Sequence, residues 1–380
     1  MNIDFSKLPV PSFLYIEKKI IENCEKIKIV EKETNVKFLV AFKAFSQWKL
    51  FPIIKKYFNA AAVSSPYEAL LSYNYFSKKN IHLYSVAIDE KEVLLYSKIC
   101  SHIVFNSLNQ FFKFKNHFLK NNIKLGIRVN PQYSEVKTDL YNPSSPFSRL
   151  GVCDHHLKNG LPKEISGLHF HVLCENDSYA LENTLKEFIK RFGHLLNDIE
   201  WVNFGGGHLI THKNYNIDHL IKVINDFKHK YRHLEIYMEP GAAYVWEAAY
   251  LVAKVLDIVE NNGVKTAIVN VSFAAHMPDT LEMPYKPNIV GALPYPKENF
   301  FIYRIGGISC LAGDFMTEYS FEKPLNIDDI ILFEDMAHYT VVKTNMFNGL
   351  NHPAIVLLTT NNDIKVLKEF SFEDYKNRID

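Results

Sequence analysis

The chain has 380 residues, of which 47% are hydrophobic and 14% aromatic, enough for a large core and for more than one domain. Its 43 basic and 42 acidic residues nearly cancel, so the overall charge gives no reason to expect binding to nucleic acid or to an anionic membrane. Any charged ligand must then be held by a local site.

The first ten residues, MNIDFSKLPV, contain no apolar core of a signal peptide. No apolar run in the chain approaches the roughly 18 residues that a membrane span needs. The 5 cysteines are far apart and never form a C-x-x-C pair, which argues against a disulfide framework and against a zinc site. We therefore expect a soluble cytoplasmic protein.

Short apolar runs rich in β-forming residues recur in the first two thirds of the chain, and stretches with helical spacing, such as 66–79 and 178–196, separate most of them. Strands that alternate with helices predict parallel β–α units, and eight such units predict a closed (β/α)8 barrel, here placed at residues 17–240. A doubly wound open sheet is the alternative. The eight predicted strands are 37–43, 59–65, 81–87, 102–107, 124–130, 165–173, 201–207 and 234–241.

After Gly241 the pattern changes, because strand-like runs now follow one another with turns between them. This predicts a separate antiparallel β domain of residues 241–380, which residues 1–16 would join through a strand at 11–16, followed by a helix over 17–33. The predicted strands of this domain are 265–273, 300–307, 329–335, 339–343 and 353–358.

In a barrel enzyme the chemistry lies where the strands end at the C-terminal face. Lys43 ends the first predicted strand between Phe42 and Ala44, which would partly desolvate its amine and suit it to form a Schiff base; a lysine that simply reaches into solvent is the alternative. His169 and His171 share one face of the sixth strand. They could bind a metal, stack on a ring cofactor, or be ordinary core histidines.

Two further strand ends carry suitable groups. Gly205, Gly206 and Gly207 follow the seventh strand, where backbone N–H groups of such barrels often bind phosphate. Glu239 ends the eighth strand and could pair with a protonated ring nitrogen, or could merely cap a turn. Together these strand ends would bring an amine, a stacking ring, a phosphate site and a pyridinium partner to one barrel mouth, and pyridoxal phosphate (PLP) requires all four.

A second cluster lies in the predicted β domain. Cys310 stands in the glycine-rich segment GGISCLAGD and is interpreted either as an exposed thiol or as a buried structural cysteine. Asp314 could bind a substrate amine or cap a turn, and Tyr339 could donate its hydroxyl to a phosphate or simply pack.

These residues resemble PLP enzymes of the alanine-racemase-like fold, specifically the ornithine/diaminopimelate decarboxylase group and, within it, the carboxynorspermidine/carboxyspermidine decarboxylases. The resemblance covers nearly the whole chain. It is carried by AFKAFSQW, SPFSRLG, LCENDS, WVNFGGG, EPGAA, AHMPDTLEMPY, SCLAGDF and the segment YTVVKTNMFNG.

The resemblance implies decarboxylation of a carboxylated polyamine to spermidine or norspermidine in polyamine biosynthesis, by a homodimer with shared active sites. Lys43 would carry PLP, His171 would stack on its ring, and Glu239 would pair with the ring nitrogen. Gly205 to Gly207 and Tyr339 would hold the phosphate. Cys310 would act as the acid near Cα of the substrate in the other subunit.

Two departures from the group concern ligand binding. Ala242 stands where the group often has a phosphate-binding arginine, so the phosphate must be held differently. Leu311 replaces the acidic residue that follows the cysteine in the ornithine and diaminopimelate enzymes, which argues against those substrates. A longer amine would then be bound by residues of the other motifs, for which the candidates are Asp314, His276, Asp279, Glu282, Glu175, Arg149 and Glu239.

Other functions stay open at this point. A decarboxylase for diaminopimelate or another basic amino acid, or a racemase, would use the same fold. A non-catalytic PLP carrier would lack the β domain that holds Cys310. A metal-dependent barrel hydrolase would use His169 and His171, but the chain shows no complete set of further ligands.

Overall fold

The computed structural model describes residues 4–283 and 285–380, which form two compact units. The barrel unit runs from Ile21 to Tyr244, and the sheet unit joins the residues up to Ile20 to those from Val245 onward. The sequence predicted these two boundaries between residues 16 and 17 and between residues 240 and 241. Within the described residues, no helix combines the length and apolar character that crossing a membrane would require.

The strands of the barrel unit are parallel, and from β3 onward each pairs with the next along the chain, as the alternating pattern predicted. Their runs of buried residues are typical of strands covered on both faces. In the described chain they are β2 (Lys37–Phe38), β3 (Val40–Ala41), β4 (Ala61–Val63), β5 (Ile81–Ser85), β6 (His102–Phe105), β7 (Lys124–Arg128), β8 (Gly167–His169), β9 (Trp201–Asn203) and β10 (Glu235–Met238).

The barrel closes through its first strand, which is split into β2 and β3 at Leu39. The β2 half pairs with β10 and the β3 half pairs with β4. The N–H group of Leu39 donates to the carbonyl of Met238 at 2.8 Å, and that of Val40 donates to Ala60 at 2.9 Å. One strand therefore contacts both of its neighbours, so the (β/α)8 barrel is confirmed and the open sheet is excluded.

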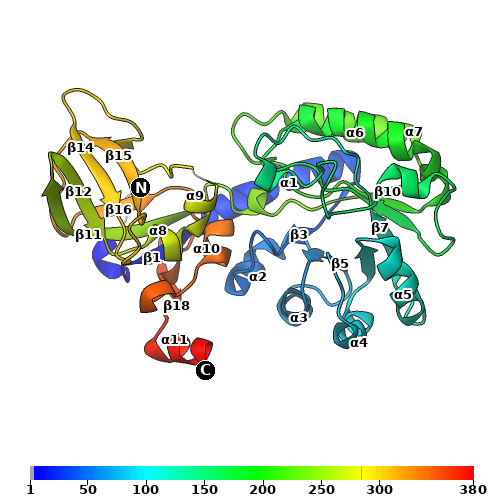
Figure 1. Ribbon diagram of the computed structural model, residues 1–380, viewed down its shortest axis with the longest axis horizontal. Helices are drawn as coiled ribbons and strands as arrows, with labels where there is room; N and C mark the ends of the chain where they lie inside the picture. The colour runs from blue at the N-terminus through cyan, green and yellow to red at the C-terminus, as the bar shows by residue number, and fades with distance from the viewer. Residues whose placement is uncertain (1–3, 284) are drawn as a thin grey trace. The chain divides into compact units, whose positions relative to one another are not determined.

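Helices follow the barrel strands, and α6 and α7 lie side by side (Figure 1). Polar side chains cap the N-termini of three of these helices. Ser65 at α3, Ser107 at α5 and Asp177 at α6 each accept a backbone N–H from the first turn. The α-helices of the described residues 17–244 are α1 (Glu17–Thr34), α2 (Phe51–Ile54), α3 (Pro66–Tyr75), α4 (Glu90–Ile99), α5 (Leu108–Leu119), α6 (Ser178–Phe192) and α7 (Ile217–Lys230).

The side chain of Trp201 fills part of the barrel interior. Trp201 is fully buried, and its indole occupies the space where two neighbouring strands have glycine. A Cβ on Gly167 would lie 2.0 Å from the indole, and one on Gly126 would lie 2.4 Å from it. Because side chains alternate along a strand, Asn203, two positions after Trp201, also points inward and lies one layer nearer the C-terminal mouth.

The sheet unit is a mixed sheet in the order β13-β15-β14-β12-β11-β1-β17-β18, with β16 paired to β11. Most pairings are antiparallel, as predicted, but β1–β17 and β12–β14 are parallel. The β12–β14 connection is long enough for this because it contains α8 (Phe273–His276) and α9 (Pro278–Glu282). The strands described here are β1 (Ser12–Ile16), β11 (Ala249–Asn261), β12 (Val264–Val269), β13 (Ala292–Leu293), β14 (Phe301–Gly306), β15 (Phe315–Phe321), β16 (Ile330–Phe333), β17 (Ala354–Leu358) and β18 (Ile364–Lys368).

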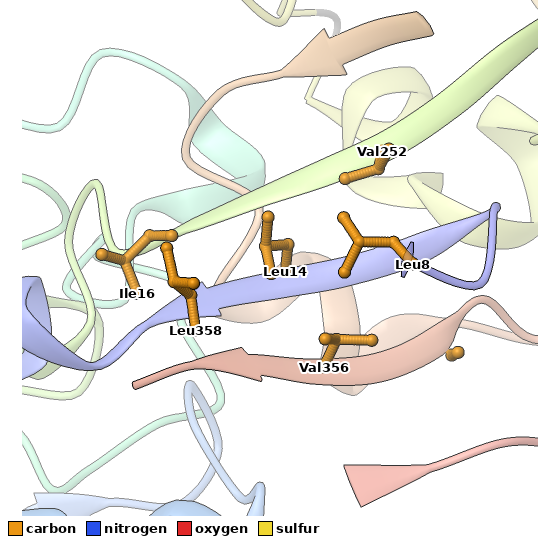
Figure 2. Close-up of a cluster of buried hydrophobic side chains, with 7 residues drawn as sticks. Leu8, Leu14, Ile16, Val252, Val356 and Leu358 are labelled. Atoms are coloured by element: carbon orange, nitrogen blue, oxygen red, sulfur yellow. The ribbon is translucent and has the colours of Figure 1, made fainter. Parts of the chain in front are cut away.

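Strand β1 lies between β11 and β17, and its apolar residues form a core with theirs. Figure 2 shows Leu14 and Ile16 of β1 close to Val252 of β11 and to Val356 and Leu358 of β17. All of these side chains are at most 9% exposed. The predicted strand at 11–16 is thus confirmed as part of the sheet unit.

One predicted strand of this unit is wrong. Residues 339–343 form the helical turn α10 (Tyr339–Lys343), although their β-branched residues favour a strand. The turn buries Thr340 and Val341, and the Thr340 hydroxyl donates to the Asp279 carboxylate at 3.2 Å. Tertiary contacts therefore outweigh local preference at this position. The chain ends with helix α11 (Phe372–Ile379).

Candidate active site

Lys43 lies just past β3, in the turn at the C-terminal end of the split first strand. Phe42 and Ala44 are buried, whereas Lys43 is exposed, so the desolvation expected from its two neighbours is not present. The amine is close to Glu68 on α3, where it lowers the pKa of the carboxyl, although burial, the larger effect, raises that pKa overall. Glu68 also accepts the N–H of Ser64 at 2.7 Å.

Glu239 lies at the end of β10 with a side chain that is only 12% exposed. Burial raises the pKa of this carboxyl to about 6, while a hydrogen bond from Asn203 and the charges of Arg128 and Lys43 lower it. The Asn203 amide donates to Glu239 Oε1 at 2.6 Å. The other oxygen, Oε2, lies 3.7 Å from His169 Nε2, beyond hydrogen-bond distance.

His169 is not the cation of an ion pair with Glu239. Its ring is buried, and burial together with the charge of Arg128 holds its pKa well below the usual value. The ring is therefore neutral at pH 7 and meets Tyr84 edge-on, with 5.5 Å between ring centroids. In the described chain neither of its nitrogens has a hydrogen-bond partner.

The glycine turn after β9 holds the second histidine. The Gly206 N–H donates to His171 Nδ1 at 3.0 Å, which leaves the proton on Nε2 of the neutral ring. The Gly205 N–H donates to the Asn203 side chain at 2.9 Å. A Cβ on Gly206 would lie 2.4 Å from the Glu239 carbonyl oxygen and 3.2 Å from His171 Cε1, so glycine is required for this close approach.

Arg128 supplies a buried cation at the end of β7. Its guanidinium is 4.6 Å from the Tyr84 ring centroid and donates to the His171 carbonyl at 3.2 Å. The Tyr84 hydroxyl donates to Asn106 at 2.8 Å. Asn106 in turn donates to the Arg149 carbonyl at 2.9 Å and thereby fixes that loop, while the Arg149 side chain itself is exposed.

The sheet unit carries the other predicted residues. Cys310 is exposed in the loop between β14 and β15, so the interpretation as a buried structural cysteine is excluded. Tyr339 is the first residue of α10 and is half-buried. Asp314 is 4% exposed, and its two carboxylate oxygens accept the backbone N–H groups of Ala274 and Ser309, each at 3.0 Å.

Asp279 and His276 are both buried in the short helices after β12. Asp279 Oδ2 accepts from the Tyr285 hydroxyl at 2.9 Å and from Thr340, while its Oδ1 has no partner among the described residues. Burial lowers the pKa of His276 to about 4, and its Nδ1 accepts the N–H of Ser272 at 3.1 Å. The remaining candidate carboxylates, Glu175 and Glu282, are both exposed, and Glu282 forms an ion pair with Lys343.

The barrel unit thus brings together Lys43, His171, the glycine turn and Glu239 from four different strand ends. Sequence reasoning missed Arg128, Asn203 and Glu68. Arg128 had a visible signal, because it is a charged residue inside the apolar run KLGIRVN. Asn203 and Glu68 had none, since a single asparagine or a glutamate in a helix is common on any surface.

This arrangement fits a flat, charged ring better than it fits a bare ion. His169, His171 and Glu239 offer ligand atoms within 4.8 Å of one another, so the metal hypothesis has a geometric basis. However, Asn203 already occupies Glu239 Oε1, and the Gly206 N–H already occupies His171 Nδ1. The other oxygen of Glu239 can accept from a ring nitrogen, and the imidazole of His171 is held in one orientation, so this pair fits PLP.

Comparison with known proteins decides the family. Residues 25–337 match the model of the family described as "Pyridoxal-dependent decarboxylase, C-terminal sheet domain". The chain belongs to the pyridoxal-dependent decarboxylases. This decarboxylase is 41% identical to carboxyaminopropylagmatine decarboxylase from Synechocystis sp., over 100% of this chain and 97% of the relative. It is 40% identical to carboxynorspermidine/carboxyspermidine decarboxylase from Campylobacter jejuni, over 98% and 99%.

Solved structures agree with this assignment. The crystal structure of the Campylobacter jejuni carboxynorspermidine decarboxylase complexed with norspermidine is 39% identical, with a TM-score of 0.91 over 98% of this chain and 100% of that one. Diaminopimelate decarboxylase from Helicobacter pylori, complexed with L-lysine, is 18% identical with a TM-score of 0.85 over 99% and 98%. The latter likeness shows the fold, which confirms the predicted architecture of barrel and sheet domain.

Proposed function

We propose that this decarboxylase uses PLP to remove the α-carboxylate of a carboxylated polyamine such as carboxyspermidine or carboxynorspermidine. The observation that carries the proposal is the likeness, at 35–40% identity over nearly the full chain, to two relatives named for these substrates. The norspermidine bound to the Campylobacter jejuni enzyme supports the same class of ligand. PLP would supply an electron sink for the carbanion that forms when carbon dioxide leaves.

The residues of the barrel unit take the cofactor-binding roles. Lys43, an exposed residue, would provide the amine that attaches PLP. Glu239 would accept a hydrogen bond from the ring nitrogen, and the neutral ring of His171 would lie against the cofactor ring. In the turn of Gly205 to Gly207, the N–H groups of Gly205 and Gly206 already donate to Asn203 and His171, so of this turn only Gly207 is proposed to hold the phosphate. Tyr339 of the sheet unit is the other proposed phosphate ligand.

The sheet unit is proposed to complete the site in a homodimer with shared active sites. Cys310, whose loop is exposed, would deliver a proton to Cα of the substrate bound by the other subunit. Asp279 would bind a remote ammonium group, because its Oδ1 is a buried acceptor that no described residue satisfies. Glu239, His276, Arg149 and Glu175 are further candidates for substrate contacts.

A diaminopimelate decarboxylase is the second candidate function. A relative named so, from Methanocaldococcus jannaschii, is 25% identical over 65% of this chain. Leu311 weighs against it, because an exposed leucine stands where that group has an acidic residue next to the cysteine. A leucine at this position cannot pair with the second ammonium group of a short substrate.

A substrate panel tests the proposal. Purified protein loaded with PLP is given carboxyspermidine, carboxynorspermidine, carboxyaminopropylagmatine and diaminopimelate, and carbon dioxide release is measured for each. We expect the two carboxylated polyamines to have the highest kcat/KM, separated from each other by about 10-fold to 200-fold at most, since they differ by one methylene. A higher kcat/KM for diaminopimelate would refute the proposal, and one for carboxyaminopropylagmatine would move it to that substrate.

A further inference from the structure

The Asp314 carboxylate accepts hydrogen bonds from two backbone segments, the loop that carries Cys310 and the helical turn α8. Oδ2 accepts the N–H of Ser309, the residue before Cys310, and Oδ1 accepts the N–H of Ala274 on α8. At the base of the loop the Gly307 N–H donates to the Asp314 carbonyl at 2.6 Å. The carboxylate therefore joins the Cys310 loop to the first helical turn after β12.

The packing around this carboxylate leaves little room for any other ligand. Asp314 is 4% exposed, and a Cβ on Gly307 would lie 2.3 Å from its Oδ2. The glycine is thus needed so that the carboxylate can reach the loop amides. Hydrogen bonds from N–H groups to an ionised carboxylate are among the stronger ones in proteins, so the loop is well restrained at this side.

The other side of the loop is held by Asn348. Its side-chain oxygen accepts the N–H of Cys310 at 2.8 Å. Asn348 has a φ of 63°, a left-handed conformation that asparagine tolerates better than most residues. Two polar side chains, Asp314 and Asn348, therefore fix the backbone of an otherwise exposed loop, while the thiol itself stays exposed.

We infer that Asp314 is a positioning residue for Cys310 and does not bind a remote amine of the substrate. This inference rests on the proposed function, in which Cys310 supplies a proton. If Asp314 acts only through the placement of the thiol, its removal changes the proton-transfer step and leaves substrate binding nearly unchanged. If it binds an amine, its removal raises KM whether or not Cys310 is present.

A double-mutant cycle separates the two roles. The variants Asp314→Asn, Cys310→Ala and their combination are compared in the PLP-loaded protein with carboxyspermidine. We expect Asp314→Asn to lower kcat by about tenfold, with KM within about twofold, and to change kcat by less than about twofold once Cys310 is alanine. A rise in KM of about tenfold in both backgrounds, or multiplicative losses of kcat, would overturn the inference.

A second variant and a second readout keep the test decisive. Asn348→Gly removes the other contact with the loop but keeps the left-handed backbone accessible, and it should show the same fall in kcat at constant KM. Asp363→Asn, at an exposed turn, is the matched control and should leave kcat and KM unchanged.

We call the two hydrogen bonds from Ala274 and Ser309 to Asp314 the clamp. Hydrogen exchange, measured without PLP or substrate, reports on it directly. In Asp314→Asn the amides of Ala274 and Ser309 should exchange faster, while those of the barrel strands keep their wild-type rates. Unchanged exchange at both amides would refute the clamp. If the wild-type protein released no carbon dioxide, the proposed function would fail, and the exchange data would still decide the clamp separately.

Discussion

Replacing Asn203 by leucine should change the protonation of Glu239. Asn203 is fully buried and donates to Glu239 Oε1 at 2.6 Å. A hydrogen bond to a charged group contributes about 1.5–3 kcal/mol. At about 1.4 kcal/mol for each pH unit, its loss should raise the pKa of Glu239 by roughly one to two units above the present value of about 6.

The consequence is large near neutral pH. With a pKa of about 6, roughly nine tenths of Glu239 is ionised at pH 7, and in the variant the ionised fraction should fall to between roughly a tenth and a half. A protonated Glu239 cannot keep the ring nitrogen of the proposed cofactor charged. The pH below which kcat falls should therefore move upward by the same one to two units.

The assay titrates the carboxyl directly. Carbon-13 NMR of the cofactor-free protein labelled at glutamate follows Glu239, which is assigned by comparison with Glu239→Gln, and the pH profile of kcat is measured on the PLP-loaded protein. The same midpoint in wild-type protein and in Asn203→Leu would refute the reasoning. A variant with a raised midpoint but an unchanged kcat profile would show that Glu239 does not control the reaction.

Three further outcomes are expected. Gly167→Ala should lower the free energy of unfolding by about 1–3 kcal/mol or more, because its Cβ would lie 2.0 Å from the Trp201 indole. The control Gly193→Ala, whose Cβ would lie 3.3 Å from its nearest neighbour, should lower it less, and equal melting curves for the two variants would contradict this. Burial holds the pKa of His102 at about 3, so between about pH 6.5 and pH 3 only the unfolded chain protonates this histidine. Its contribution should make the free energy of unfolding fall by about 1.4 kcal/mol per pH unit as the pH decreases toward 3. In urea titrations at several pH values, His102→Gln should lack this part of the pH dependence. Asp279→Asn should raise KM for a carboxylated polyamine by about tenfold or more with a smaller change in kcat, and an unchanged KM would exclude Asp279 from amine binding.

The sequence was sufficient to predict the barrel because its strands are buried apolar runs that end in functional groups. Lys43, His171, Gly205 to Gly207 and Glu239 could all be found at strand ends without coordinates. The contacts of Arg128 and Asn203 with these groups could not be predicted. Asn203 contacts Glu239 because β9 pairs with β10 in a register that places Asn203 opposite Tyr237. Arg128 comes near Glu239 from β7, a strand that does not pair with β10, and the closed barrel brings the two together.

The sheet unit was harder to predict for a different reason. Several of its strands pair over long sequence distances, so local patterns do not fix their partners, and the β1–β17 and β12–β14 pairs are parallel. The run YTVVK at 339–343 favoured a strand, yet buried contacts of Thr340 make it a helical turn. Similarly, the two backbone partners of Asp314 could not be seen in a sequence that suggested an amine ligand.

The most direct test of the account is carbon dioxide release from carboxyspermidine by the PLP-loaded protein, measured in parallel for the wild type and for Lys43→Ala. We expect release by the wild type together with an absorbance change of the bound cofactor on addition of substrate, and we expect neither for Lys43→Ala. Normal turnover by Lys43→Ala would show that this lysine does not carry the cofactor. A wild-type protein that does not bind PLP even after reconstitution would refute the proposed PLP-dependent decarboxylation.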